Sequence, residues 1–493
     1  FNGDARRPTA VHLMTRKEAD LSHAKFDVVV VGGGFSGALL AVQLSRRAPD
    51  LSVAVVDKGP LPGRGLAYGT KYSCHLLNVP ASNMSALPEE PHHFLRWAKV
   101  NYGTSVQPTT FLPRPAYGRY IGSLLEDAMA HGSGRNLHWI KGEASSVTRD
   151  QLIEIRLTDG SVRVAQSLVL AVGNFPPANL KIPGLSAGSS RYVRSPWSAT
   201  ALHEIPKNGA VLLIGSGLTS VDLAVALKSE GFAGHIHILS RRGLMPLTQR
   251  PTGQWPHFWD EPGPQTIRKL LRLVREQVRM ASESGGDWRE VIDSLRPVTQ
   301  NIWQSLSLKE RKRFLRHVRS YWEVHRHRIA PEIGETIANL VHQGQAIIYA
   351  GRVTDYREFP GHAEVALQDR KTGDVRTLNV DRVINCTGPE TDCRRIEDPL
   401  IKNLLAHGLA RPDPLFLGLD VDPNGALIDS SGKPSPALYV IGPARKGSLW
   451  ETIAVPELRA QASDLAAHLA CTLEPGIQPV PEDEAIGAEA NPG

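Results

Sequence analysis

Cysteine is scarce in this chain, and the spacing of the few cysteines excludes some chemistry. Only four occur in 493 residues, and no two of them form a C-x-x-C pair. A structural zinc site and a dithiol–disulfide reductase both normally need closely spaced cysteines. Both are therefore disfavoured, and the low cysteine content indicates a reducing, cytoplasmic setting.

Long hydrophobic runs and a strong excess of one charge are also missing. No apolar run approaches the ~18 residues that a membrane-spanning helix needs, so we expect no membrane partner. The net charge is only +6, and the arginine-rich segment 311–328 is typical of a solvated helix face, so a nucleic-acid partner is not expected. The length accommodates two or three domains with their own cores.

A run of four valines, 28–31, leads into a glycine-rich turn. The turn has the pattern G-x-G-x-x-G, an apolar helix pattern follows, and the next strand pattern ends in Asp57. Such glycines let a backbone approach a pyrophosphate at a helix N-terminus, and the carboxylate accepts from a ribose hydroxyl. An ordinary strand-end acid is the alternative for Asp57. We predict an FAD site formed by Gly32, Gly34, Phe35, Ser36, Gly37, Asp57 and Lys58.

A second copy of this pattern occupies residues 211–242. It has Ser220 in place of the third glycine, and its second strand ends in Ser-Arg-Arg rather than in an acid. Guanidinium groups at that place pair with a 2′-phosphate, which favours NADPH. A relic turn that binds nothing is the alternative. The predicted NADPH contacts are Gly215, Gly217, Leu218, Thr219, Ser220, Ser240, Arg241 and Arg242.

Each copy is followed by a hairpin pattern and a returning strand that ends in glycine. The first hairpin spans 152–164 and its strand ends at Gly173; the second spans 364–378 and its strand ends at Gly388. Both glycines are predicted to lie at the cofactor edge, because ligands bind at the carboxyl ends of such strands. The sequence predicts an α/β fold of two doubly wound, Rossmann-like domains, one inserted in the other, with a helical insertion.

The domain boundaries follow from these patterns. We assign residues 24–199 and 391–475 to an FAD-binding domain, 200–390 to an NADPH-binding domain, 255–335 to its helical insertion, and 1–23 and 476–493 to a disordered arm (or tag remnant) and tail. The insertion holds five tryptophans, and its apolar residues recur at three and four. It either covers one face of the cofactor cleft or caps the structure without a substrate role.

Two further segments carry candidate site residues. The loop 63–85 is long and apolar, and a flavin ring is the natural group for it to lie against. Its His75 is interpreted as a packing or hydrogen-bonding residue beside the cofactor rather than an acid or base. The last strand pattern ends at Gly442 and Pro443, where a helix start aims N–H groups at a phosphate or a flavin carbonyl. Residues 325–328 read His-Arg-His-Arg, but histidines two apart on a helix diverge, so we predict no metal site.

Segments 65–70, 75–80, 322–328 and 442–459 together carry a family resemblance. From about residue 26 to 470 the chain resembles bacterial FAD/NAD(P)-binding proteins of the "NAD-binding 9" group, most of which have no assigned reaction. More distantly it is similar to flavin-containing monooxygenases and to N-hydroxylating and Baeyer–Villiger enzymes. That resemblance implies that Asn78 lies near the flavin C4a atom, whereas segments 174–177 and 192–197 only partly match the monooxygenase signature.

The favoured interpretation is an NADPH-dependent flavoprotein monooxygenase. NADPH would reduce FAD, and a C4a-(hydro)peroxyflavin formed with O2 would oxygenate a small organic substrate. Asn78, Trp450 and Glu451 are the candidate catalytic residues. The alternatives are a flavin reductase or dehydrogenase that passes electrons to a small molecule or protein partner, and a non-catalytic FAD/NADPH-sensing or scaffold protein. The sequence leaves the substrate and the oligomeric state open.

Overall fold

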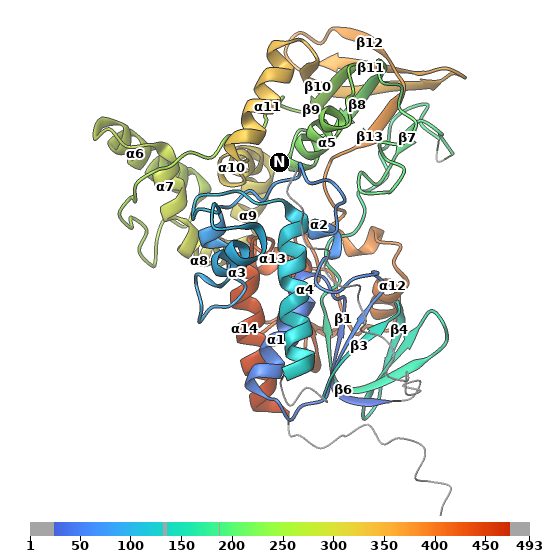
Figure 1. The fold of residues 1–493 in the computed structure, drawn as a ribbon, viewed down its shortest axis with the longest axis vertical. Coiled ribbons are helices and arrows are strands. Elements are labelled where there is room, and N and C mark those ends of the chain that lie inside the picture. The colour runs from blue at the N-terminus through green and yellow to red at the C-terminus, as the bar shows by residue number, and fades with distance from the viewer. Residues whose placement is uncertain (1–23, 132–135, 187, 474–493) are drawn as a thin grey trace, which may run out of the picture.

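The computed structural model describes residues 24–131, 136–186 and 188–473, so the predicted disordered arm and the predicted tail lie outside the described residues. The described chain forms two units, each built on its own sheet, with a group of helices at one side (Figure 1). This arrangement confirms the predicted α/β class with two dinucleotide-binding-type sheets.

The first unit contains an eight-stranded sheet. Its main order is β14-β15-β6-β1-β2-β3, and the β4–β5 hairpin joins it through β6. The inner strands are parallel and buried on both faces, which explains the unbroken valine run of β1. The strands are β1 (Lys25–Val31), β2 (Val53–Asp57), β3 (Leu137–Lys141), β4 (Ala144–Arg149), β5 (Ile153–Leu157), β6 (Val162–Leu170), β14 (Ala426–Ile428) and β15 (Pro434–Val440).

The second unit contains a seven-stranded sheet in the order β12-β11-β10-β9-β8-β13-β7. All of its strands fall between β6 and β14 in the sequence, so the chain leaves the first sheet and later returns to it. The strands are β7 (Tyr192–Val193), β8 (Ala210–Ile214), β9 (His235–Ser240), β10 (Ala346–Glu358), β11 (Ala363–Asp369), β12 (Val375–Val380) and β13 (Arg382–Asn385).

Three sequence boundaries differ from the structure. The second arm of the first hairpin and the returning strand are one continuous strand, β6, because no turn residue interrupts them. Strand β7 pairs with β13 in the second sheet, although residues up to 199 were assigned to the first domain. The helix pattern of the sequence runs over 451–470, but the final helix begins only at Val455, with Pro456 in its first turn, so Trp450 and Glu451 precede it.

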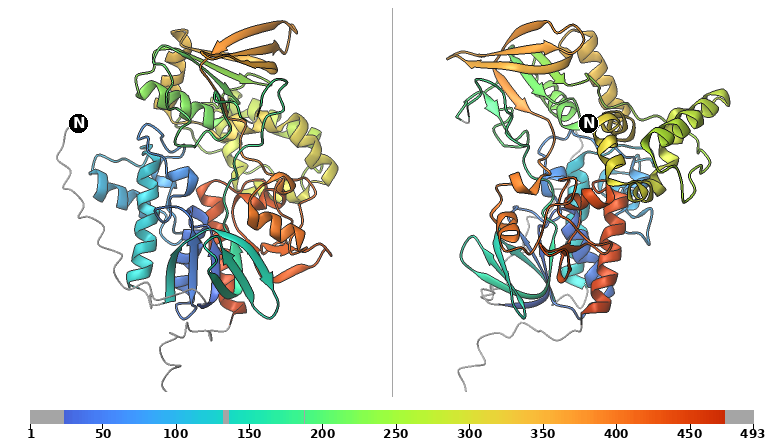
Figure 2. Two further views of the ribbon diagram at one scale, coloured as in Figure 1. Left: turned by 90° about the vertical axis from the view of Figure 1, so that its right-hand side faces the viewer. Right: turned by 180° about the vertical axis from the view of Figure 1, so that it is seen from behind.

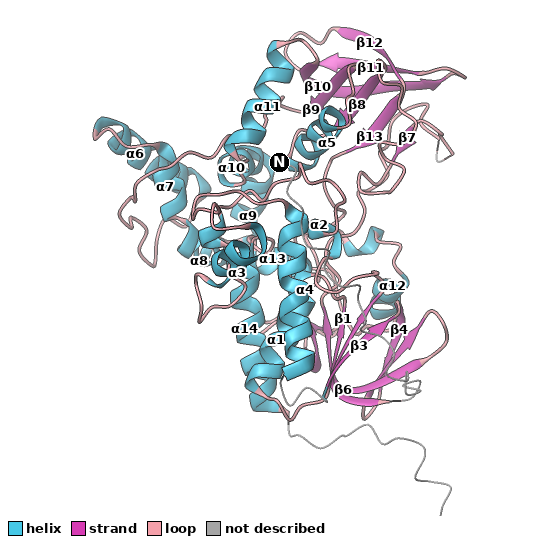
Figure 3. Ribbon diagram, viewed as in Figure 1, coloured by secondary structure: helices cyan, strands magenta, loops and turns pink. Residues whose placement is uncertain are grey.

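Helices cover the sheets from defined sides. In the first unit α1 (Phe35–Arg47), α4 (Arg114–His131) and α14 (Val455–Thr472) lie side by side on one face of the sheet, and α12 (Pro399–Ala406) packs beside β4 on the other (Figure 3). In the second unit α5 (Leu218–Ser229) and α11 (Pro331–His342) pack together over the sheet. No helix of the described ranges is long and apolar enough to cross a membrane.

The remaining helices are short or belong to the insertion, whose helices project to one side of the two units (Figure 2). Short helical segments of the first unit are α2 (Gly65–Tyr68), η1 (Ala81–Asn83), α3 (His93–Tyr102), η4 (Cys393–Arg395), η5 (Pro443–Arg445) and α13 (Lys446–Leu449). The insertion contains α6 (Ile267–Glu283), α7 (Trp288–Ser294), η3 (Arg296–Val298), α8 (Thr299–Ser305), α9 (Leu308–His317) and α10 (Arg319–Arg326).

Candidate functional site: two glycine turns and the cleft between the units

The first glycine turn exposes the N-terminus of α1. Gly34 caps this helix without any side-chain hydrogen bond, so the first N–H groups face outward. Gly32 has φ +103°, and a Cβ there would lie 2.3 Å from the Ala171 carbonyl oxygen. A Cβ on Gly37 would lie 1.9 Å from the Gly32 carbonyl oxygen. Because no side chain fits at Gly32 or Gly37, the backbone segments approach each other closely. The turn therefore presents its backbone N–H groups, which is what binding of a pyrophosphate needs.

Asp57 ends β2 beside this turn. Burial raises the pKa of its carboxyl above the ordinary value, while backbone hydrogen bonds from Gly59, Gly33 and Lys58 oppose that rise. The Lys58 ammonium is exposed and lies 2.6 Å from Glu143 Oε1. A cavity of about 390 Å³ borders Gly32, Asp57 and Lys58. A carboxylate held at the edge of this space is placed to accept hydrogen bonds from ribose hydroxyls.

The segment after β15 turns back onto α1. Gly442 has φ +88°, and a Cβ there would lie 3.0 Å from the Ser36 hydroxyl oxygen. Its N–H donates to Gln461 Oε1 at 3.0 Å. The Gln461 Nε2 and the Thr452 hydroxyl are buried without a hydrogen-bond partner in the described chain. These two orphaned polar groups on either side of the α14 N-terminus suit a bound polar ring such as a flavin.

The second glycine turn repeats the first with one change. Gly217 caps α5 without a side-chain hydrogen bond, and a Cβ on Gly215 would lie 2.2 Å from the Cys386 carbonyl oxygen. Ser220 replaces the third glycine, is fully buried, and donates its hydroxyl to the Gly215 carbonyl oxygen. The serine thus holds the helix against the turn, and the helix N-terminus stays open for a phosphate.

A cleft of about 660 Å³ joins the second turn to the first unit. Arg241 is exposed at this cleft, and the Arg242 guanidinium lies 5.0 Å from the centre of the Tyr321 ring. The Ser240 hydroxyl oxygen accepts from the Gly243 N–H at 3.0 Å. Of the residues expected at the NADPH site and at the strand ends, the structure brings together Gly215, Gly217, Leu218, Thr219, Ser240, Arg241, Arg242, Gly388 and Pro443 along this cleft.

His75 is not among the residues that line this cleft. It is buried, its Nδ1 lies 2.9 Å from the Thr70 hydroxyl, and its Nε2 lies 3.0 Å from the Asp222 carbonyl oxygen. Burial lowers its pKa. Arg114 forms an ion pair with Asp222 at 2.8 Å in the same region. His75 therefore uses both ring nitrogens to join the loop of the first unit to α5 of the second.

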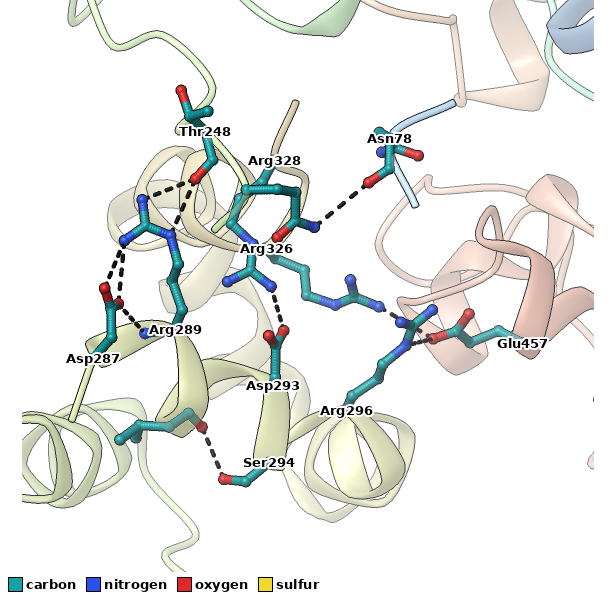
Figure 4. Close-up of polar contacts among 12 residues, drawn as sticks. Asn78, Thr248, Asp287, Arg289, Asp293, Ser294, Arg296, Arg326, Arg328 and Glu457 are labelled. Carbon is teal, nitrogen blue, oxygen red and sulfur yellow. Dashed lines mark hydrogen bonds and ion pairs between the residues drawn. The ribbon is translucent and has the colours of Figure 1, made fainter. Parts of the chain in front are cut away.

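Asn78 lies on the same loop, at the edge of the insertion. Its backbone carbonyl oxygen accepts from Gln249 Nε2 at 3.5 Å (Figure 4). Its side-chain amide has no hydrogen bond within the described part of the chain and remains available to a ligand. Its role at the flavin stays a prediction, and so does that of Gly173, which has φ +69° at the end of β6.

Trp450 and Glu451 form a tight link to the insertion. Trp450 has φ +63° and ψ −62°, and the Glu451 N–H donates to the Leu449 carbonyl oxygen at 2.8 Å, which makes Trp450 the centre of a γ-turn. The Glu451 side chain is buried and accepts from Trp322 Nε1 at 2.9 Å. A catalytic role for either residue remains a prediction; their contacts show that they position the insertion.

Cations that sequence patterns did not single out also line the cleft. These are Lys181, Arg319, Arg352 and Lys446, and they come from four separate segments. Burial lowers the pKa of Lys446, while the charge of Glu323 opposes that shift. Lys446 and Glu323 are 123 positions apart, so no local sequence pattern could predict that their charges influence each other.

The arginine-rich segment is a solvated face only in its first part: Lys312, Arg313, Arg316 and Arg319 are exposed, whereas the two arginines at its end are buried. Arg326 and Arg328 are only 6% and 3% exposed. Arg326 and Arg296 each lie 3.2 Å from Glu457 Oε1, and Arg328 pairs with Asp293 (Figure 4). The pairs of Glu457 attach η3 and α10 to α14, and the pair of Arg328 attaches the residues after α10 to α7. Among the described residues no group of three potential metal ligands occurs.

Comparisons with known proteins agree with this geometry. Residues 29–175 match the FAD-NAD(P)-binding family, "NAD-binding 9". The resemblance predicted from the sequence is confirmed. Thiamine thiazole synthase of Yarrowia lipolytica is 37% identical over 79 residues, which are 15% of this chain and 25% of that protein. The chain thus matches about a quarter of the length of this curated relative.

Solved structures share the fold over nearly the whole chain. Ornithine hydroxylase of Pseudomonas aeruginosa has a TM-score of 0.62 at 17% identity, with 91% of this chain and 100% of that chain covered. L-lysine 6-monooxygenase of Pseudomonas syringae has a TM-score of 0.63 at 17% identity with the same coverage. Thioredoxin reductase of Lactococcus lactis has a TM-score of 0.52 at 13% identity, covering 91% and 98%. The fold is that of FAD/NAD(P)-dependent oxidoreductases.

Proposed function

We propose that this protein is an FAD- and NADPH-dependent monooxygenase. In the net reaction NADPH, a proton, O2 and an organic substrate give NADP⁺, water and the oxygenated substrate. The observation that carries the proposal is the single cleft in which Arg241 and the second glycine turn meet Gly388 and Pro443. A nicotinamide nucleotide held there extends from one unit toward the other.

Each part of the cofactor sites has a defined task in this proposal. The α1 N-terminus and Asp57 hold the FAD pyrophosphate and ribose, and the α5 N-terminus holds the NADPH pyrophosphate. Arg241 pairs with the 2′-phosphate and gives preference for NADPH over NADH. Bound FAD supplies hydride acceptance and the reaction with O2. Lys446, half-buried at the wall of the cleft, adds positive charge beside these anionic groups.

Two observations favour oxygenation over a thiol-linked reductase. The solved monooxygenases have TM-scores of 0.62 and 0.63, against 0.52 for the thioredoxin reductase. Burial raises the pKa of Cys386 to about 12 and that of Cys393 to about 11, so neither thiol forms a reactive thiolate near neutral pH. The matching monooxygenases are named for ornithine and lysine; only the reaction class is proposed here.

The test uses the purified yellow holoprotein, reduced by NADPH without air and then mixed with isotopically labelled O2. Oxygenation predicts labelled oxygen in an organic product when a substrate is present, and hydrogen peroxide when it is absent. If the label appears only in peroxide or water for every organic compound offered, the protein is an oxidase or reductase and the proposal fails.

A further inference from the structure

The insertion borders a second, apolar cavity of about 570 Å³ that is partly open to solvent. Its walls include Leu271, Val274, Trp303, Phe314, Trp322 and Trp450. Helices α6 to α10 and Trp450 border this space with mostly apolar side chains. A volume of this size falls in the range of ligand pockets, roughly 300–1,000 Å³.

Helix α6 lines this cavity with one apolar face. Leu270, Leu271, Val274 and Val278 share one face, and all four are only half-buried. Leaving such side chains against water forfeits roughly 25 cal/mol per Å² of apolar surface. An apolar occupant would recover that free energy, so the helix face is matched to a ligand.

The ionisable residues that line the cavity indicate which kind of ligand it binds. None of the described residues that line the cavity is a carboxylate; the ionisable ones are Arg275, His317, Tyr321 and His325. An ammonium group placed here would lose its hydration without gaining a counter-charge, which is costly. The tryptophan and phenylalanine rings instead offer flat apolar surfaces. A neutral aromatic molecule satisfies both conditions.

The cavity shares a wall with the cofactor cleft. On α10, Trp322 and His325 face the cavity, whereas Glu323 and the neighbouring His327 face the cleft. The second part of the wall is Trp450, whose ring lies 4.7 Å from Lys446 Nζ, and Lys446 lines the cleft. Trp303 Nε1 fixes this wall by donating to the Gly447 carbonyl oxygen at 2.8 Å.

We propose that this cavity binds the organic substrate, and that the substrate is a neutral aromatic or similarly apolar molecule. This inference rests on the proposed monooxygenase function, because it gives the substrate class for that reaction. It assigns the insertion to substrate recognition rather than to a structural cap. Trp322 and Trp450 stand between the cavity and the cofactor cleft, so oxygenation requires the bound substrate to pass this wall.

The first test is binding of N-phenyl-1-naphthylamine, a neutral dye that brightens in apolar surroundings, to the FAD-loaded protein. Val274→Trp fills the cavity and is expected to weaken dye binding about tenfold or more, and Val278→Trp serves as a second filling variant. Met280→Trp adds the same bulk to the exposed side of α6, where Met280 is 43% exposed, and is expected to bind like the wild type. FAD content and the urea midpoint verify that each variant is folded.

Toluene or indole should displace the dye, and the n-butylammonium ion should not. Unchanged dye binding in both filling variants, or displacement by n-butylammonium alone, overturns the site. A panel of neutral arenes is then tested for faster NADPH consumption and incorporation of labelled oxygen. If arenes bind but none is oxygenated by a flavin that NADPH does reduce, the substrate assignment fails. If NADPH does not reduce the flavin at all, the proposed function fails while the binding result stands.

Discussion

The indole Nε1 of Trp322 donates to Oε1 of Glu451 at 2.9 Å, which ties the insertion to the segment just before α14. His327 lies 3.8 Å from the other oxygen of the same carboxylate. The connection places α10 as a partition between the apolar cavity and the cofactor cleft. The two proposed binding events therefore take place on opposite faces of one helix.

Arg241→Ala tests the 2′-phosphate site. Loss of a charge-assisted contact should weaken NADPH binding by about 1–3 kcal/mol and leave NADH binding nearly unchanged. Lys228→Ala removes one exposed positive charge from α5 away from the cleft and should affect neither nucleotide. Titration of both nucleotides followed by flavin or tryptophan fluorescence measures the effect. Equal losses for NADPH and NADH would refute the assignment.

Asp57→Ala tests the FAD ribose contact. Removing the carboxylate should lower FAD occupancy after purification, because the ribose hydroxyls lose their acceptor. Asp159→Ala, which alters an exposed hairpin turn, is the matched control and should remain fully loaded. Occupancy is read from the ratio of flavin to protein absorbance. A fully yellow Asp57→Ala protein would show that another group holds the ribose.

Substitutions of Trp450 test whether its positive φ strains the backbone at the wall between the cavity and the cleft. Both Trp450→Ala and Trp450→Gly remove a buried indole, a loss of about 3–5 kcal/mol in the free energy of unfolding. Only glycine adopts φ +63° without steric cost, so the glycine variant should be the more stable of the two by roughly 1 kcal/mol. Urea denaturation compares them. An alanine variant as stable as the glycine variant would mean that the turn relaxes in solution.

His237 gives a pH-dependent prediction. Burial, assisted by the charge of His235, lowers its pKa from 6.5 to about 4. Because the unfolded chain takes up the proton first, stability is complete above pH 6.5 and falls as the pH drops toward 4. Between about pH 7 and about pH 5 the wild type should lose roughly 2 kcal/mol more than His237→Gln. His342→Gln, at an exposed position, should behave like the wild type. Parallel pH dependence of wild type and His237→Gln would contradict the burial effect.

The two sheets could be predicted from the sequence because their signals are local. The valine run before Gly32, the glycine turns and the hairpin dipeptides each depend on neighbours in the chain. Strand β7 escaped prediction because two residues carry no periodicity, and its place is fixed by pairing with β13 nearly 200 residues later. The burial of Arg326 and Arg328 likewise depends on Glu457 and Asp293, whose positions only the fold supplies.

The residues of the candidate site were also predictable only where their sequence signals are local. Gly215, Gly217 and Arg241 were found from spacing, because phosphate recognition uses consecutive backbone groups. The contacts of Glu451 were not found, since its partner Trp322 lies 129 positions earlier and no local pattern links the two. The apolar cavity was visible in the sequence only as apolar residues at helical spacing together with a group of tryptophans, a pattern that a filled core shares.

The decisive experiment is anaerobic rapid mixing of the holoprotein with NADPH, and separately with NADH. We expect that NADPH bleaches the flavin absorbance, that NADH does so at least about tenfold less efficiently, and that Arg241→Ala removes most of this difference. A flavin that stays oxidised with both nucleotides, or that both reduce equally well in the wild type, would contradict this expectation.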